Sequence, residues 1–258
     1  MERANTRTDR ITQTKKKKKL NPTLSFLHYN KYLIFVIVEV GVLMPSLKKA
    51  LREIKKELTE KQNVRENAQN DMRKAISLSK RTILQIHQKK MKDAKKLIEN
   101  AKEIISKLDE TSEIHPEIVH GGLFNAALQE YSEANIFLKL VEESEFVTPK
   151  EIGVPSVDYL LGLADVIGEY RRLALDALRE GHTRESELCL QTMDEIYVEL
   201  MVIDEAHIVP ELRRKCDVAR RIIDITRGDI TQEVRRNSLE NHLKLFEKLA
   251  KRMTSKPK

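Results

Sequence analysis

The chain has 258 residues, enough for one large domain or two small ones. Of these, 34% are charged and 40% hydrophobic, while glycine (8) and proline (7) are scarce and tryptophan is absent. The abundance of Lys, Glu, Leu, Ile and Ala predicts a helical protein, because these residues lose little side-chain freedom in a helix. The two cysteines, Cys189 and Cys216, lie outside any CxxC pattern. They argue against a disulfide-rich secreted protein and favour reduced thiols in the cytoplasm.

The formal net charge of +7 suggests nucleic-acid binding, but most of it belongs to one short segment. Residues 1–43 contain nine basic and three acidic side chains, a net charge of +6. The remaining 215 residues are therefore almost neutral. The body of the protein has no general positive field, so RNA binding would require a local basic patch.

Residues 1–43 differ in composition from everything that follows, and three interpretations compete. The apolar run over 32–43, which follows Lys15–Lys19, is too short for a membrane span and contains Glu39. A basic arm that binds nucleic acid is the second interpretation. The third is that translation begins at Met44, where Pro45-Ser46 suits a helix start. We favour the third: a non-native or disordered extension over 1–43, a helical domain over 44–253 and a frayed tail over 254–258, with no membrane association.

The first part of this domain has the pattern of long amphipathic helices. Leu and Ile recur every three or four residues from Leu47 to Leu58, which marks one apolar face. The same spacing continues to about Glu110 without Gly or Pro. We expect helix throughout, with one bend or break near Gln85–Lys90.

The rest of the chain alternates helical stretches with breaks that contain Gly or Pro. Ser156 is expected to be the N-cap of one helix, and Gly228 is expected to break the last one. The expected helices run from 116 or 122 to 143, from 156 to 179, from 184 to 202, from 210 to 227 and from 231 to 252. No strand pattern is present. The sequence therefore predicts an all-α, single-domain antiparallel helical bundle of about six to seven long helices.

Two pairs of acidic residues stand out within these helices. Glu130 and Glu133 are three residues apart, and Asp165 and Glu169 are four apart, so each pair shares a helix face. Like charges at these spacings repel. Asp165 is also set in an apolar stretch, where an unpaired carboxylate costs several kcal/mol. A cation, a hydrogen-bond network, a raised pKa or an arginine must compensate.

Two such pairs on facing helices would form a cage of four carboxylates. Hard oxygen ligands of this kind select Mg²⁺ or Mn²⁺, which can activate water and stabilise charge on a phosphodiester. Spacing alone leaves the ordinary alternative open: Glu130 and Glu133 on a solvated face, and Asp165 and Glu169 paired with a nearby base. The candidate bases are Arg171, Arg172 and Lys139. No P-loop, HExxH or Ser/Cys nucleophile motif is present.

The stretches that hold these acids resemble motifs of the translin and translin-associated factor X family. Residues 128–134, LQEYSEA, are similar to the LQEYxEA motif of translin-associated factor X. Residues 154–169, VPSVDYLLGLADVIGE, resemble the VPxxDYLLGxADLTGE motif that both branches share, with Val166-Ile167 in place of Leu-Thr. Residues 211–217, ELRRKCD, resemble a late LRRKxD segment. The resemblance covers roughly residues 47–235.

This resemblance implies a function and an assembly. In the family's nuclease subunit, two acids from each of the first two motifs hold a divalent cation. All four positions, Glu130, Glu133, Asp165 and Glu169, are acidic here. Pure translin subunits lack part of this set. A single chain with both features resembles the archaeal members, which form homo-oligomers, typically octameric shells that bind RNA inside.

Basic residues near the acids are candidates for nucleic-acid contacts. Arg172 lies seven residues after Asp165 and returns to the same helix face. It could hold a phosphate or merely neutralise the acids, and both roles stay open. The predicted nucleic-acid-binding residues are Arg171, Arg172, Arg213, Arg214 and Lys215.

Two functions from different classes follow. The first is a Mg²⁺- or Mn²⁺-dependent endoribonuclease that cleaves single-stranded or short structured RNA within a homo-oligomer, predicted to be an octamer. The second is a scaffold that binds RNA or single-stranded DNA without catalysis. The four acids distinguish the two, because a pure binder has no reason to keep them together.

Overall fold

The computed structural model describes residues 22–203 and 209–254. Within these ranges the chain forms eight helices and no strand, so the all-α prediction is confirmed. The chain divides into two units, Met1–Lys61 and Gln62–Lys258. The buried core and all the predicted site residues belong to the second unit, which begins at Gln62, whereas the predicted helical domain begins at Met44. None of the described helices is both long and apolar enough to cross a membrane.

Helix α1 runs from Pro22 to His87 and α2 from Met91 to Ile114. Part of the predicted extension, residues 22–43, is therefore helical, and residues 1–21 lie outside the described part. The break expected near Gln85–Lys90 is confirmed. It is a tight turn in which Lys89 adopts a positive φ of 59°, and the Lys90 amide donates to the Gln85 carbonyl at 2.9 Å.

The middle of the chain contains two long helices separated by short elements. After the four-residue α3 (Pro116–Val119), α4 runs over Gly122–Glu143. The loop that follows holds α5 (Pro149–Ile152), whose Thr148 and Glu151 form a capping box. Helix α6 spans Ser156–Arg179. Its N-cap is Pro155, and Ser156 is the first helical residue, so the predicted Ser156 cap was wrong by one position.

Helices α7 (Thr183–Val202) and α8 (Pro210–Thr254) complete the fold. The predicted break at Gly228 was wrong, because α8 continues through it. One glycine costs a helix only about 1 kcal/mol. Thr226 and Ile230, on either side of it, are both buried and hold α8 against the bundle. Thr254 is the last residue of α8, and the rest of the predicted tail, 255–258, lies outside the described residues.

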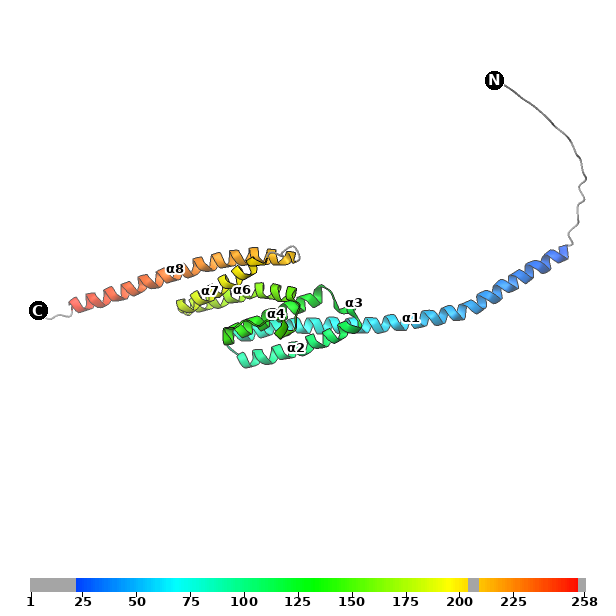
Figure 1. Ribbon diagram of the computed structural model, residues 1–258, viewed down its shortest axis with the longest axis horizontal. Coiled ribbons are helices and arrows are strands. Elements are labelled where there is room, and N and C mark those ends of the chain that lie inside the picture. Colours follow the sequence, from blue (N-terminus) through cyan, green and yellow to red (C-terminus); the bar gives the residue numbers. More distant parts are fainter. Residues whose placement is uncertain (1–21, 204–208, 255–258) are drawn as a thin grey trace, which may run out of the picture. The chain divides into compact units, whose positions relative to one another are not determined.

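Helix α6 lies at the centre of the bundle. It packs against α4, α7 and α8, and Figure 1 shows α6 alongside α4 and α7. Completely buried side chains fill the space between these helices, with Phe137 on α4, Ile167 on α6 and Met193 on α7. The acid-bearing stretches of α4 and α6 are therefore neighbours because the core is built around them.

Gly162 brings α4 and α6 unusually close at this point. A Cβ added at Gly162 would lie 2.8 Å from the Gln129 carbonyl oxygen, 2.8 Å from the Ser132 Cβ and 2.9 Å from the Glu133 nitrogen. Any side chain at this position would push the two helices apart. The contact falls between the residues that carry the acids, so Gly162 sets the spacing of the candidate site.

Candidate functional site

The candidate site is formed where α4 faces α6. Glu130 and Glu133 come from the middle of α4, and Asp165 and Glu169 come from α6. Glu133 is the most deeply placed of the four, with only 8% of its surface exposed. The side chains of the other three are between 23% and 32% exposed.

The other three acids lie within electrostatic reach of Glu133. Burial raises the pKa of its carboxyl group to about 9, with smaller contributions from Asp165, Glu130 and Glu169. Lys215 acts in the opposite direction. Without a bound cation, Glu133 is therefore largely protonated at neutral pH. A cation at this place would favour its charged form.

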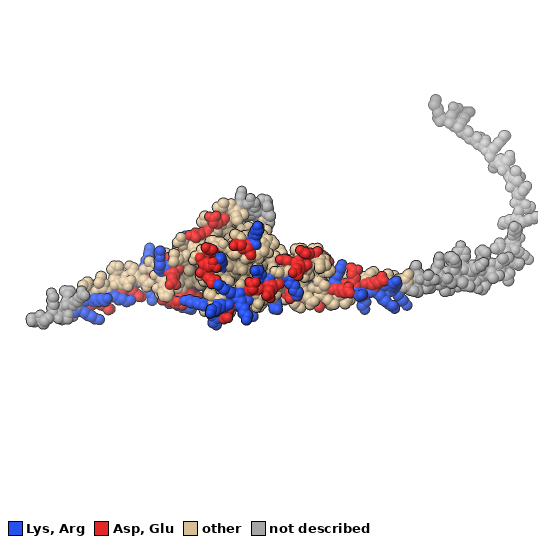
Figure 2. Space-filling model, turned by 60° about the horizontal axis from the view of Figure 1, so that its bottom comes forward, with Lys and Arg blue, Asp and Glu red and all other residues tan. Residues whose placement is uncertain are grey.

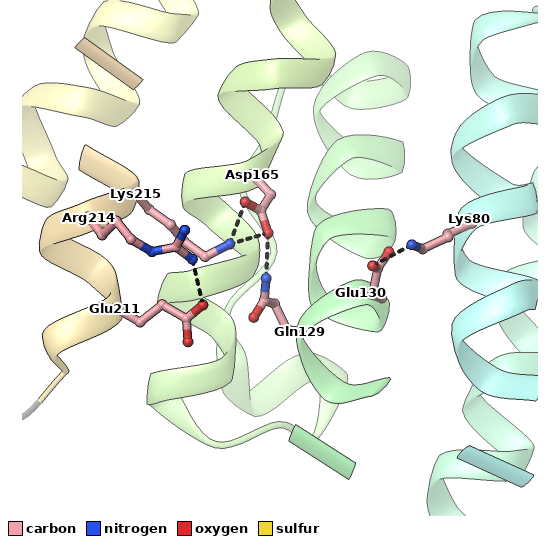
Figure 3. Close-up of polar contacts among 7 residues, drawn as sticks. All are labelled: Lys80, Gln129, Glu130, Asp165, Glu211, Arg214 and Lys215. Carbon is pink, nitrogen blue, oxygen red and sulfur yellow. Dashed lines mark hydrogen bonds and ion pairs between the residues drawn. The ribbon is translucent and has the colours of Figure 1, made fainter. Parts of the chain in front are cut away.

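Asp165 is held by groups from two other helices. The Lys215 ammonium, on α8, lies 2.5 Å from Oδ1 and 2.6 Å from Oδ2. The Gln129 amide, on α4, donates to Oδ2 at 2.5 Å. Figure 3 shows Lys215 and Gln129 converging on the Asp165 carboxylate from two sides. Lys215 is only 13% exposed, so this ion pair is largely withdrawn from solvent.

Glu130 makes a different contact. Its carboxylate pairs with the Lys80 ammonium of α1 at 2.9 Å, and Figure 3 shows it turned toward α1 and away from Asp165. The hydrogen bond and charge of Glu130 raise the pKa of Lys80. Lys80 is 61% exposed, so solvent screens this pair much more than it screens the Lys215 pair.

Glu169 contacts a buried histidine. Its Oε2 lies 2.5 Å from Nε2 of His87, the last residue of α1, whose side chain is 3% exposed. The His87 ring packs against Phe137, with 5.2 Å between the ring centroids, and Phe137 packs against Tyr170 at 5.9 Å. The aromatic packing fixes the imidazole beside the carboxylate.

Each acid thus has its own environment. Glu130 pairs with Lys80 and Asp165 with Lys215, Glu169 contacts the His87 imidazole, and Glu133 keeps its proton. In this arrangement the described residues include no group of three or more His, Cys, Asp or Glu side chains placed to hold a metal ion. The donor set itself fits a hard divalent cation, because all four side chains offer carboxylate oxygens. Their role as metal ligands stays a prediction.

The five predicted nucleic-acid-binding residues have different environments. Lys215 lies within the site. Arg171 is engaged with α8, where it donates to Thr226 Oγ1 at 2.7 Å and to the Ile222 carbonyl at 3.3 Å. Arg214 pairs with Glu211 at 3.1 Å, as Figure 3 shows. Arg172 and Arg213 are exposed. Figure 2 shows basic and acidic side chains interspersed over the face that it presents, as the nearly neutral body predicts.

Sequence analysis did not identify three residues of the site. Lys80 and His87 come from α1, far from the acids in the chain, and no pattern links them to α4 or α6. Gln129 directly precedes Glu130 within the first motif, so its position was the only available signal.

Tyr131, a neighbour of both acids on α4, is a core residue that is 1% exposed, and burial raises its pKa to about 12.

The fold and this acidic cluster define an all-α bundle with two carboxylate-bearing helices at its centre. The Translin family model matches residues 44–224. A curated relative, the uncharacterized protein MJ0175 of Methanocaldococcus jannaschii, is 32% identical over 218 residues, which cover 84% of this chain and 92% of the relative. The chain belongs to the translin family.

Solved structures agree with this assignment. The crystal structure of AfC3PO is 34% identical and matches with a TM-score of 0.64, over 71% of this chain and 96% of that one. A complex of AfC3PO with duplex RNA is 33% identical, with a TM-score of 0.63 over 71% and 95% of the two chains. Apo-NeC3PO, 24% identical with a TM-score of 0.65 over 71% and 96%, shares the fold.

Proposed function

We propose that this protein is a metal-dependent endoribonuclease, in which Glu130, Glu133, Asp165 and Glu169 hold Mg²⁺ or Mn²⁺. The observation that carries the proposal is the buried Glu133, whose pKa is raised by burial and by all three other acids. A carboxyl group in this position weakens the fold at neutral pH, and a glutamine or an apolar residue would avoid the cost. Four acids kept together at such a cost are typical of a catalytic site.

The chain's own residues would prepare the site for a phosphodiester. A bound divalent cation supplies activation of water and stabilisation of charge on the phosphate. Lys215 neutralises Asp165 in the free protein and becomes available to a phosphate oxygen once Asp165 binds a cation. Lys80 likewise pairs with Glu130 in the free protein and would become available once Glu130 binds a cation, and it is more exposed than Lys215.

RNA is the substrate that we propose. The AfC3PO complex contains duplex RNA, and the resemblance to that protein covers 71% of this chain and 95% of that one. Binding would depend on local basic groups, because the body has little net charge; we propose Arg172, Arg213, Arg214 and Lys215 as contacts. Arg171 is the weakest of the predicted contacts, because its guanidinium is occupied on α8. We further propose a cytoplasmic location, a homo-oligomer and, as in the sequence prediction, an octamer.

A cleavage assay tests the proposal. Labelled single-stranded, hairpin and duplex RNA of the same sequence would be incubated with the wild-type protein in Mg²⁺, in Mn²⁺ and in EDTA. We expect cleavage in either metal, none in EDTA, and a loss of about two to three orders of magnitude in Asp165→Asn. Asp176→Asn is a matched control, since it makes the same change on α6 at a side chain that is 42% exposed and lies outside the acid set.

The alternative is a scaffold that binds RNA or single-stranded DNA without cleaving it. The ion pairs of Glu130 with Lys80 and of Asp165 with Lys215, which occupy two of the acids without a metal, are compatible with such a role. RNA binding by the wild-type protein, combined with no cleavage in either metal and no Mn²⁺ binding, would establish the scaffold and reject the nuclease. Equal cleavage by wild type and Asp165→Asn would instead locate the activity at another site.

A further inference from the structure

His87 stands outside the sequence-based site, although it is buried against one of the four acids. It ends α1, and the turn that follows fixes its backbone through hydrogen bonds from Lys89 to Ile86 and from Lys90 to Gln85, both 2.9 Å. Its side chain is 3% exposed. A buried imidazole in a rigid turn is restricted to one orientation.

The two ring nitrogens of His87 have different surroundings. Nε2 lies 2.5 Å from Glu169 Oε2. Nδ1 is buried and has no hydrogen-bond partner among the described residues. A proton on Nδ1 would be a buried donor without an acceptor, which costs about 1–3 kcal/mol. A proton on Nε2 instead forms a hydrogen bond, and Nδ1 is then left with only an unused lone pair.

We infer that His87 is the positioning residue of the site: its Nε2–H donates to Glu169 Oε2 and thereby orients the carboxylate so that Oε1 is available to a divalent cation. This inference rests on the proposed metal site. Carboxylates that bind metals are commonly oriented by a second hydrogen-bond partner, and loss of that partner lowers metal affinity by about 10- to 100-fold.

The packing of His87 supports a fixed role of this kind. Phe137, which holds the imidazole ring, lies four residues after Glu133 on α4 and also packs against Tyr170, the neighbour of Glu169. The same aromatic side chain therefore supports one acid-bearing segment from each helix. Because Phe137 is completely buried, the imidazole cannot turn away without opening the core.

Three substitutions of His87 distinguish the contribution of the Nε2–H hydrogen-bond donor from that of the aromatic ring packing. His87→Gln places an amide nitrogen near the position of Nε2, His87→Asn places one near Nδ1, and His87→Phe keeps the ring packing without a donor. We expect His87→Gln to bind Mn²⁺ within about threefold of the wild-type Kd. His87→Asn and His87→Phe should bind about 10- to 100-fold more weakly. Mn²⁺ titration followed by electron paramagnetic resonance measures this without RNA or catalysis.

Two further measurements exclude a merely structural role. His87→Phe should melt close to the wild-type temperature in EDTA, because the aromatic contact with Phe137 remains, while its metal affinity falls. A long-range ¹H–¹⁵N spectrum of the wild-type imidazole should show the proton on Nε2. A proton on Nδ1 would overturn the inference.

A control at Asp165 distinguishes failure of this inference from failure of the proposed function. If Asp165→Asn loses Mn²⁺ affinity and both His87→Asn and His87→Phe retain it, the metal site stands and the role of His87 is rejected. If the wild-type protein does not bind Mn²⁺, the proposed function fails and this inference fails with it.

Discussion

The contact between α4 and α6 differs from the C-terminal part of α8 in what it buries. Between α4 and α6, the carboxyl group of Glu133 lies in the interior, where an apolar residue would be more stable. On α8, large apolar side chains lie in solvent: Leu239, Leu243 and Phe246 are 61%, 55% and 71% exposed. Neither arrangement favours the stability of an isolated chain.

This difference indicates what kind of binding partner would stabilise each region. The α4–α6 contact keeps the Glu133 carboxyl group inside the bundle, so the partner that would stabilise its charged form is small enough to enter, such as a cation. On α8 the apolar residues recur at i, i+4 and i+7 along one face, which is the pattern of a helix that packs against another protein surface. The predicted homo-oligomer would supply that surface.

Glu133→Gln should have the largest effect, because it removes a proposed metal ligand without changing the shape of the side chain. We expect RNA cleavage to fall by about two to three orders of magnitude.

In EDTA the same variant should be more stable than wild type. The folded-state pKa of Glu133, about 9, lies above its ordinary value of 4.5. The folded protein thus holds a proton that the unfolded chain loses above pH 4.5, and wild-type stability falls as pH rises toward 9.

Denaturant unfolding at pH 5 and pH 8 in EDTA measures this difference. The advantage of Glu133→Gln should be small at pH 5 and should grow by roughly 1.4 kcal/mol for each pH unit up to pH 8. Saturating Mn²⁺ should reverse the order by stabilising only the wild-type protein. An equal difference at both pH values would show that Glu133 does not carry a raised pKa.

The exposed face of α8 should control assembly. We expect Leu243→Glu/Phe246→Glu to shift the protein from a homo-oligomer to a smaller species in light scattering, since each buried Leu or Phe contributes about 1.5–3 kcal/mol. Asn237→Glu/Asn241→Glu adds the same charge on the opposite side of α8 and should leave the oligomer intact. Dissociation by both pairs would indicate a general charge effect and contradict an interface on the apolar face.

Gly162→Ala tests the close approach of α4 and α6. The added Cβ would meet the backbone of α4 at under 3 Å, so we expect a loss of about 1–3 kcal/mol in unfolding free energy and weaker Mn²⁺ binding. Gly168→Ala, on the same helix, meets nothing within 4 Å. It should stabilise the protein by about 0.5–1 kcal/mol. Similar melting temperatures for the two variants would mean that the helices can separate without cost.

Much of the fold could be predicted from local signals. Apolar spacing and the prolines located α4, α6 and α7 to within a few residues, and the turn after His87 lies within the stretch where one bend or break was expected. The interruption at Gly228 was wrong, because the tertiary packing of α8 outweighs a small local preference. The four-residue α5 was missed, although Thr148 and Glu151 stand at the spacing of a capping box.

The candidate site was only half predictable. Helical spacing and the family motifs indicated the acids, because these lie close together in the sequence. Their basic partners depend on tertiary packing: Lys215 lies 50 residues from Asp165, and His87 lies 82 residues from Glu169. Lys215 was predicted to contact nucleic acid, but its position against Asp165 follows only from how α8 crosses α6.

Substitution of the two lysines of the site, Lys215 and Lys80, should have the smallest effects, and these effects should differ between the two. Each holds a carboxylate that would have to turn to a cation, so removing the lysine removes a competitor. We expect Lys215→Met to bind Mn²⁺ about three- to tenfold more tightly than wild type in the absence of RNA, because this ion pair is largely withdrawn from solvent. Lys80→Met should change the Kd by less than about threefold, since its pair with Glu130 is exposed and screened. Weaker Mn²⁺ binding by Lys215→Met would mean that the lysine holds Asp165 in its binding position and does not compete with the metal.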